Sequence, residues 1–303
     1  MTNKQAIGLF IIPSFIWGST WYEITFQLGK VDPIISVAYR SALAGIILIL
    51  YCLLTKRKLT FTLNNHFFMF LQGVFLYGIN YWFVYLAETH ITSGLVAVLF
   101  SLIIVMNIIF SSIFLKHPIK RKVVVAATLG IIGTAVVFYP ELKGITIGHD
   151  YFTSVFICLG GVILASLGNI IASYNHKKEI PIIQNNAFGM IYGAIALSIV
   201  ALFLGKPFNF DFSFPYISSL MYLAVFGSVI AFNTYLKLMS MWGPGKAAYI
   251  VLVTPVIAIF ISYLLEGYKL SLYSLVGALL VLGGNYLIVR KKKEPQVLEG
   301  KDL

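Results

Sequence analysis

Ten long apolar stretches constrain this chain more than any other feature. They lie at about residues 6–27, 33–54, 66–87, 91–115, 122–140, 151–174, 183–204, 215–236, 243–265 and 270–290. The hydrocarbon core of a bilayer is ~30 Å thick, and about 20 helical residues cross it. Each stretch is therefore long enough to form a transmembrane helix. The sequence predicts an all-α membrane protein with ten spans.

The composition agrees with this prediction and excludes other classes. Hydrophobic residues make up 59% of the chain and charged residues 11%, whereas a soluble domain has roughly 25% charged residues. A spanning β-barrel would show segments of ~10 residues that alternate apolar and polar side chains, and no such alternation occurs. The first stretch is too long for the apolar part of a signal peptide, so we expect a retained span.

Basic residues are distributed unevenly between the two sides of the predicted spans. If the N-terminus is cytoplasmic, fourteen Lys and Arg residues fall in the N-terminal segment, the second, fourth and sixth connections and the RKKK run at 290–293, against four in connections on the other side. This bias is the positive-inside pattern. It predicts a multi-pass protein of the bacterial plasma (inner) membrane with both termini in the cytoplasm. The net charge of +11 then needs no nucleic-acid partner.

An internal repeat divides the chain into two halves. A shift of 150 residues aligns Ala97 with Ala247, Tyr85 with Tyr235, Ser112 with Ser262 and Gly133 with Gly283, among other pairs. We expect a first repeat at 1–140, an exofacial loop at 141–150, a second repeat at 151–290 and a cytoplasmic tail at 291–303. Each repeat has five spans, an odd number, so the two are inverted. Inverted repeats are characteristic of secondary transporters that open a central site to each side in turn.

Several residues resemble those of the EamA family in the drug/metabolite transporter superfamily. They are Trp17-Gly18-Ser19, Arg40 and the stretch "GPGKAAYIVLVTPVIAIFISYLLEGYKLSLYSLVGALLVLGGNYLI" at 243–288. The resemblance covers nearly all of residues 6–290. It implies two five-helix repeats, with the first four helices of each around a central cavity and the fifth outside. The first repeat departs from the pattern, because Val105 and Lys116 stand at the equivalents of Pro255 and Glu266. We therefore expect a proline kink, at Pro255, in the second half alone.

Glu23 is an acidic residue well inside a predicted span, and such residues are functional candidates by default. Glu23 and Arg40 each lie about seven residues from the turn between the first two spans, so they reach similar depth. We expect them to pair, directly or through water, in a vestibule open to the outside. The alternative is that both extend to the exofacial head groups. If transport is coupled to protons, Glu23 is the first candidate carrier.

Aromatic and amide side chains complete the predicted substrate cavity. Trp17 and Trp21 are four residues apart and share one helix face; Trp21 could instead be an interfacial anchor. Tyr77, Asn80 and Tyr81 fall on one stripe of the third span, and an asparagine facing lipid would be unsatisfied. The remaining candidates are Asn107, Asn169, Asn233 and Tyr249. For the asparagines, hydrogen bonds between helices are the alternative role.

Other polar residues are given structural roles. Glu88 and Glu266 lie at the outer ends of the third and ninth spans, where we expect solvated helix-end carboxylates. Cys52 and Cys158 are interpreted as small apolar fillers. The five histidines are not clustered, and neither an H-E-x-x-H nor a G-x-x-x-x-G-K-[ST] motif occurs. We therefore expect no enzyme, no metal centre, no cofactor and no ATP hydrolysis.

The predicted function is secondary transport, stated most concretely as export of small metabolites or amino acids by alternating access. Efflux of drugs or toxic compounds and uptake of metabolites are alternatives with the same fold. A non-transporting membrane sensor or assembly protein is an alternative of another class. The expected partners are a small-molecule substrate, the lipid bilayer and protons, with uniport as the alternative to proton coupling. No oligomeric state is predicted.

Overall fold

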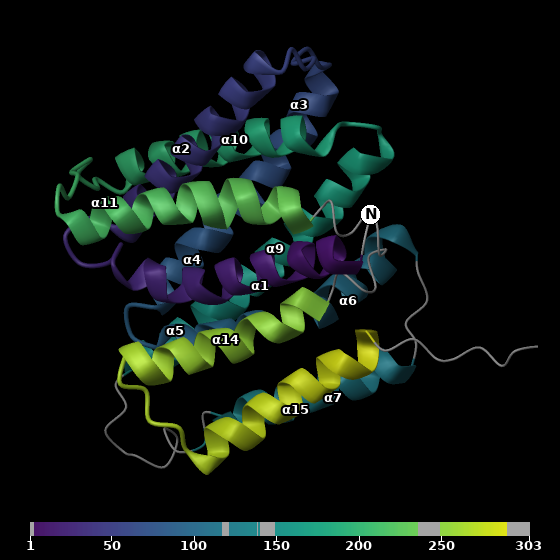
Figure 1. The fold of residues 1–303 in the computed structure, drawn as a ribbon, viewed down its shortest axis with the longest axis vertical. Helices are drawn as coiled ribbons and strands as arrows, with labels where there is room; N and C mark the ends of the chain where they lie inside the picture. Colours follow the sequence, from purple (N-terminus) through teal and green to yellow (C-terminus); the bar gives the residue numbers. More distant parts are fainter. Residues whose placement is uncertain (1–2, 117–120, 138, 140–148, 236–248, 290–303) are drawn as a thin grey trace, which may run out of the picture.

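The computed structural model describes residues 3–116, 121–137, 139, 149–235 and 249–289 (Figure 1). Within these ranges every regular element is a helix. The first half contains α1 (Asn3–Thr25), α2 (Pro33–Leu54), α3 (Leu63–Gln72), the π-helix η1 (Gly73–Ile79), α4 (Asn80–Ala87), α5 (Ser93–Phe100), α6 (Ile103–Leu115) and α7 (Arg121–Val137). The second half contains α9 (His149–Lys177), α10 (Ile182–Phe203), α11 (Phe214–Met221), the π-helix η2 (Tyr222–Ile230), α14 (Tyr249–Leu265) and α15 (Leu272–Val289).

These elements combine into ten crossing segments, one for each apolar stretch. The third span is Leu63–Ala87, the fourth is Ser93–Phe114 and the eighth is Phe214–Tyr235. In the described residues, six helices are long and apolar enough to cross a membrane, and shorter apolar helices lie in α7, α14 and α15. The predicted all-α fold with ten spans is confirmed. The start of the predicted ninth span, at 243–248, lies outside the described residues.

Local sequence signals set several helix ends. Asp32 precedes Pro33 at the start of α2, and its carboxylate accepts a hydrogen bond of 3.1 Å from the backbone N–H of Ile34. A side-chain acceptor at the N-cap, followed by proline in the first turn, is a strong start signal. Just after α10, Gly205 takes a φ of 63°, a left-handed conformation that glycine adopts without steric cost.

The packing of the helices repeats between the two halves (Figure 1). α2 packs on α10, and α7 packs on α15. α1 packs on α14 and η2, just as α9 packs on α5, α6 and η1. Exchanging each helix for its equivalent in the other half leaves this set of neighbours unchanged. The two five-helix repeats are therefore related by a pseudo-two-fold axis, as their inverted arrangement predicts.

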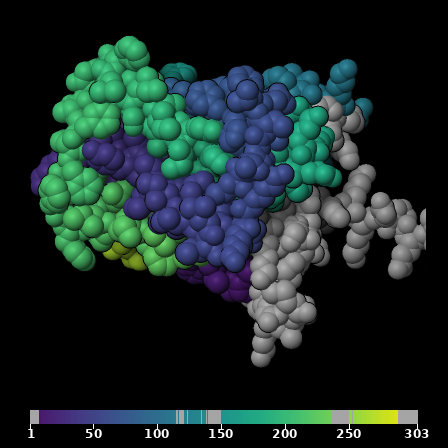
Figure 2. Space-filling view, turned by 90° about the horizontal axis from the view of Figure 1, so that it is seen from above, coloured from purple at the N-terminus to yellow at the C-terminus, as the bar shows by residue number. Residues whose placement is uncertain are grey.

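The repeats interleave instead of forming separate bodies. Figure 2 shows α2 and α3, in purple and blue, directly beside the green surface of the second half, and α10 packs on both helices. The closest approach is between η1 and α10. A Cβ atom added to Gly73 would lie 2.1 Å from the carbonyl oxygen of Gly189, so only glycine allows this contact.

Each repeat contains a π-helix at the same position. The 150-residue shift places η1, Gly73–Ile79, inside η2, Tyr222–Ile230. In η2 the hydroxyl of Ser228 donates to the carbonyl oxygen of Leu223, five residues earlier, at 3.0 Å. π-Turns are uncommon and are frequent at functional sites. Because both repeats contain one, the residues around η1 and η2 are candidates for the functional site.

Candidate functional site

Arg40 of α2 is enclosed between the two repeats. It is 2% exposed, and its guanidinium carbon lies 4.2 Å from the ring centroid of Tyr81 on α4. This cation–π contact stabilises the buried charge. Two of its three nitrogens, Nε and Nη1, have no hydrogen-bond partner among the described residues. Unsatisfied donors on a buried cation are costly, so a functional explanation is warranted.

The same guanidinium reaches the second repeat at η2. A Cβ atom added to Gly227 would lie 3.5 Å from Nη2 of Arg40 and 2.9 Å from Cγ2 of Thr20. The indole Nε1 of Trp17 donates to the carbonyl oxygen of Gly227 at 3.1 Å. α1, α2, α4 and η2 therefore meet around Arg40.

This arrangement occurs only once in the repeat pair. The 150-residue shift places Met190 at the position of Arg40 and Tyr77 at the position of Gly227. One half thus supplies a cation beside a glycine, and the other supplies a thioether and an aromatic ring. The cationic site is a feature in which the two repeats differ.

Glu88, directly after α4, is the second buried charge of the region. The prediction of a solvated helix-end carboxylate is wrong, because Glu88 is 7% exposed. Neither carboxylate oxygen has a hydrogen-bond partner among the described residues. Glu88 interacts electrostatically with Arg40 and Glu266. It is buried because α9 packs along α4 and brings Cys158 into the electrostatic field of this carboxylate.

Glu266, at the end of the ninth span, joins the two repeats. Its Oε2 accepts a hydrogen bond of 3.2 Å from the backbone N–H of Ser93, the first residue of α5, and another from the hydroxyl of Ser262. A carboxylate at a helix N-terminus interacts favourably with the helix dipole. Glu266 is thus committed to existing contacts through one oxygen, unlike Glu88.

The predicted direct pairing of Glu23 with Arg40 is wrong. The ion pairs within the described part of the chain are Lys30–Asp211 at 3.2 Å and Lys206–Asp32 at 2.7 Å. Glu23 is partly exposed on α1, whereas Arg40 extends toward α4 and η2. Glu23 and Arg40 lie at similar depth on antiparallel helices, but their side chains do not face each other. The role of Glu23 as a proton carrier remains a prediction.

Trp17 and Trp21 lie on α1 and contact different neighbours. The Trp17 ring centroid is 5.2 Å from that of Phe232 and 5.2 Å from that of Tyr235. The Trp21 ring lies 5.3 Å from Phe100, and its Nε1 is buried without a partner among the described residues. Trp17 therefore faces the second repeat, and Trp21 faces the fourth span.

Tyr77 and Asn80 lie inside the bundle, each 2% exposed. The Tyr77 hydroxyl donates to Oδ1 of Asn186 at 2.8 Å. Asn80 donates to the carbonyl oxygen of Leu76 in its own span at 3.1 Å, and its Oδ1 is buried without a partner in the described part of the molecule. The inward direction predicted for Asn80 is confirmed, and its substrate contact remains a prediction.

The other predicted amides have structural contacts. Oδ1 of Asn107 accepts hydrogen bonds from Ser166 at 2.8 Å and Asn169 at 3.3 Å, which join α6 to α9. Asn233 donates within its own helix, to the carbonyl oxygen of Val229. Tyr249 begins α14, and its side chain lies outside the described residues.

Two polar clusters were not predicted. The inner amide cluster joins α3 and η1 of the first repeat to α9 and α10 of the second, and consists of Gln72, Tyr77, Asn175, Asn185 and Asn186. Its shortest bond runs from Nδ2 of Asn185 to Oε1 of Gln72, at 2.7 Å. The outer polar cluster joins α1 and α2 to α11, and consists of Gln27, Ser36, Tyr216 and Ser219. The signal for both was a glutamine or asparagine near the end of an apolar stretch.

The two clusters are related by the repeat. Ser36 and Asn186 are equivalent after the 150-residue shift. Each bonds to a tyrosine hydroxyl of the opposite repeat, Ser36 to Tyr216 at 3.0 Å and Asn186 to Tyr77 at 2.8 Å. The clusters thus join the repeats at opposite ends of the helices, with Arg40 at a level between them.

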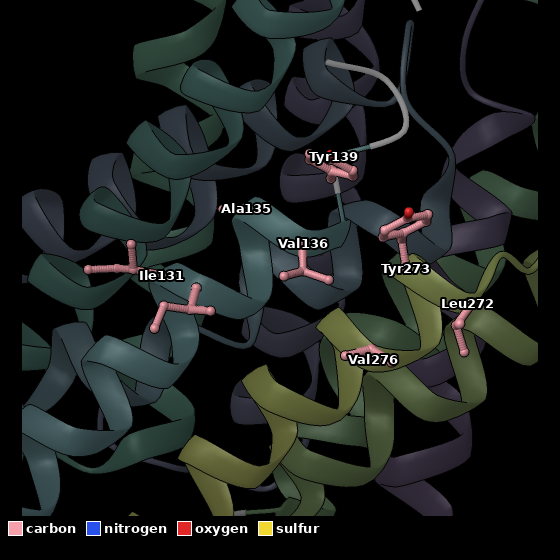
Figure 3. A pocket seen from close by; sticks show the side chains of 8 residues that line it. Ile131, Ala135, Val136, Tyr139, Leu272, Tyr273 and Val276 are labelled. Atoms are coloured by element: carbon pink, nitrogen blue, oxygen red, sulfur yellow. The ribbon is translucent and has the colours of Figure 1, made fainter. Parts of the chain in front are cut away.

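A separate apolar groove lies between α7 and α15 (Figure 3). Its volume is ≈ 680 Å³, and it is lined by Ile131, Ile132, Ala135, Val136, Tyr139, Leu272, Tyr273 and Val276. Most of these side chains are exposed, and the α7–α15 pair forms one edge of the molecule in Figure 1. The groove belongs to the apolar outer surface, away from Arg40.

Known proteins have similar sequences over most of this chain, and two of the three described next are named as transporters. PagO of Salmonella typhimurium is 24% identical over 296 residues, which cover 97% of this chain and 96% of PagO. The inner membrane transporter YedA of Escherichia coli is 27% identical over 279 residues, which cover 89% of this chain and 87% of YedA. A transporter of Archaeoglobus fulgidus is 26% identical over 297 residues, covering 95% of this chain and the whole relative.

A solved structure and a family profile also match this chain along most of its length. A solved crystal structure matches with a TM-score of 0.67 at 15% identity, and the match covers 95% of this chain and 97% of that one. The sequence profile of the EamA-like transporter family matches residues 4–139 and 152–290, the two halves that the packing relates by a pseudo-two-fold axis. The chain is a multi-pass membrane transporter and belongs to the EamA-like transporter family.

Proposed function

We propose that this protein is a secondary transporter that exports amino acids or other small metabolites across the bacterial inner membrane by alternating access. Both termini lie in the cytoplasm, as the distribution of basic residues predicts. The substrate binds where α1, α2, α4 and η2 meet, with Arg40, Tyr81 and Trp17 as its principal contacts.

The observation that carries this proposal is the unsatisfied guanidinium of Arg40 at the boundary between the repeats. Its Nε and Nη1 lack partners among the described residues although the side chain is 2% exposed. Arginine is well suited to bind a carboxylate because its planar donors match two acceptor oxygens. A polar solute that reached this level would satisfy donors that the protein leaves open.

The two polar clusters support alternating access. The inner amide cluster and the outer polar cluster join the repeats at opposite ends, with Arg40 between them. Breaking one cluster while keeping the other would open the Arg40 level to one side only. A rocking motion of this kind, with each repeat moving as a unit, is the general mechanism for inverted-repeat transporters.

Proton coupling is proposed to involve Glu23, which is partly exposed on α1 and has none of the described ion pairs. Glu23→Gln would then abolish the response of transport to a pH gradient and leave exchange of substrate across the membrane intact. Unchanged pH dependence in this variant would favour uniport or another carrier.

The test of function is transport by the purified protein in liposomes. Labelled amino acids, organic acids, amines and sugars are supplied with and without a pH gradient. We expect saturable uptake or counterflow of at least one solute, reduced by Arg40→Gln and unchanged by Arg57→Gln, a matched substitution of an exposed arginine. Absence of transport for every solute class would contradict the proposed function.

A further inference from the structure

The region around Arg40 contains two buried ionisable groups of opposite charge type, a guanidinium and a carboxyl group, that form no direct ion pair in the described residues. Arg40 is 2% exposed and Glu88 is 7% exposed. They interact electrostatically, yet neither takes part in the ion pairs of the described residues, for which the limit is 4.0 Å. The guanidinium and the carboxyl group thus interact electrostatically without a direct ion pair.

Within the described residues, hydrogen bonds from neighbouring groups do not satisfy Glu88 or two of the nitrogens of Arg40. The Tyr85 hydroxyl approaches the guanidinium but has no hydrogen bond of good geometry among the described residues, and Tyr81 offers its ring face. Both carboxylate oxygens of Glu88 and two nitrogens of Arg40 remain open. Burying charges without partners is strongly unfavourable, so both are retained for a ligand that completes them.

The net charge of the pair determines which ligand fits. Arg40 and Glu88 together carry no net charge when both are ionised. A simple anion would satisfy Arg40 and be repelled by Glu88, and a simple cation would satisfy Glu88 and be repelled by Arg40. A zwitterion with a carboxylate and an ammonium group close together satisfies both.

Glu266 differs from Glu88 in being held by existing bonds. Its Oε2 is bonded to Ser93 and Ser262, which holds the carboxylate at the start of α5, while its Oε1 is buried without a partner among the described residues. Its negative charge acts on Glu88, so a cationic group placed beside Glu88 would be favoured by both carboxylates. The acidic side of the site thus suits an ammonium group.

We propose that Arg40 and Glu88 bind the carboxylate and the ammonium group, respectively, of a zwitterionic amino acid. This inference rests on the proposed transport function and names its substrate class. In the conformation described here both charged groups are enclosed, and the amino acid reaches them when one of the two polar clusters separates.

The experiment compares an amino acid with analogues that lack one charge. Purified full-length protein in liposomes is screened for counterflow of the twenty labelled amino acids, with phenylalanine and leucine as the first probes. Competition is then measured with matched sets: phenylalanine, 2-phenylethylamine and 3-phenylpropanoate, or leucine, isopentylamine and 4-methylpentanoate. In the wild type we expect the amino acid to compete at least about tenfold better than either analogue, the effect of one charge-assisted hydrogen bond.

Substitutions identify which residue binds which charged group of the amino acid. Glu88→Gln should narrow the preference for the amino acid over the deaminated acid, and Arg40→Gln should narrow the preference over the decarboxylated amine. Arg57→Gln and Glu179→Gln, at exposed positions, should leave both ratios unchanged. If a Gln variant does not reconstitute, Arg40→Lys and Glu88→Asp are measured for the same ratios, because they retain charge and alter reach.

Equal weakening of all three competitors by each variant would overturn the proposal, because a structural role would act without regard to ligand charge. So would a wild-type protein that does not discriminate among the three. Transport of sugars, organic acids or amines without transport of any amino acid would overturn this inference and leave the proposed function standing. Absence of all transport would overturn both.

Discussion

Asn285 of α15 donates its side-chain amide to the carbonyl oxygen of Ser101, 3.0 Å away, where the fourth span breaks between α5 and α6. In an unbroken helix this carbonyl would accept from the residue four positions later. Here it accepts at 3.4 Å from Ile104, three positions later, and from Asn285. A side-chain amide of the second repeat thus donates a hydrogen bond to a backbone carbonyl that lacks its usual helical donor in the first repeat.

The second repeat loses the same helical hydrogen bond by another route. Pro255 lies inside α14, and because proline has no N–H, the carbonyl of Val251 loses its helical donor. Val251 and Ser101 are equivalent after the 150-residue shift. The sequence predicted this local change only in the second half, at Pro255, whereas the structure has it in both. The break in the first half was not predicted because no proline marks it in the sequence.

Replacing Asn285 should destabilise the protein, because its amide donates to both the carbonyl oxygen and the hydroxyl of Ser101. We expect Asn285→Leu to lower the free energy of unfolding by about 1 kcal/mol, within the range measured for hydrogen bonds between helices in membranes. Unfolding in mixed micelles measures the change. Asn233→Leu is the matched control, because the Asn233 amide bonds only within its own helix and its loss should cost less. Equal losses of unfolding free energy in the two variants would show that bonding to Ser101 stabilises the protein no more than a bond within one helix.

Gln72 and Gln27 should have opposite effects on which side of the protein is open. Gln72→Leu removes the acceptor shared by Asn175 and Asn185 in the inner amide cluster, so this end should separate more often. Gln27→Leu removes the donor to Tyr216 and Ser219 in the outer polar cluster and should favour the opposite opening.

The measurement is the rate at which a single cysteine, introduced at each end in turn, is labelled from each side. The native Cys52 and Cys158, both buried, are first replaced by alanine. We expect each variant to raise labelling at its own end and lower it at the other. A rise at both ends in either variant would indicate general loosening and would contradict the role of the clusters in alternating access.

The sequence determined the spans and their inversion because both depend on one-dimensional features: apolar length, and an odd number of crossings per repeat. It did not determine the surroundings of Glu88. A carboxylate at the end of an apolar run resembles a membrane-surface residue, and Glu88 is buried only through tertiary packing, which includes the contact of α9 with α4. Similarly, Arg40 and Glu23 share a depth, but helix rotation directs Arg40 toward Tyr81. The direction in which each side chain points depends on tertiary contacts, which cannot be predicted from the local sequence.

Gly227 should be required for the space beside Arg40. A Cβ atom there would lie 2.9 Å from Cγ2 of Thr20, which must shift, and 3.5 Å from Nη2 of Arg40, an ordinary contact. Gly227→Ala should therefore displace the Thr20 side chain and place a methyl group against the guanidinium, where the substrate is proposed to bind. A displacement of about 1 Å in a binding site can cost roughly a hundredfold in rate, and we expect counterflow to fall by about tenfold or more. Gly8→Ala, with no atom within 4 Å of its added Cβ, is the control. Full activity of Gly227→Ala with normal folding would contradict the placement of the substrate at this level.

Asp211, in the connection between α10 and α11, should make the stability of the protein depend on pH. Hydrogen bonds from the backbone N–H and the hydroxyl of Ser213, with the nearby Lys30 ammonium, hold the pKa of Asp211 below its ordinary value. Because the folded pKa is the lower one, the ionised carboxylate contributes its full stabilisation above the ordinary pKa of aspartate, about 3.9. That stabilisation is lost as the pH falls through the lowered pKa. We therefore expect the melting temperature in detergent to fall between about pH 5 and pH 3, and to fall less in Asp211→Asn than in the wild type. Asp150→Asn, at an exposed aspartate in the first turn of α9, is the control and should keep the wild-type profile. An Asp211→Asn profile that also matched the wild type would contradict the contribution of the Asp211 carboxylate to stability.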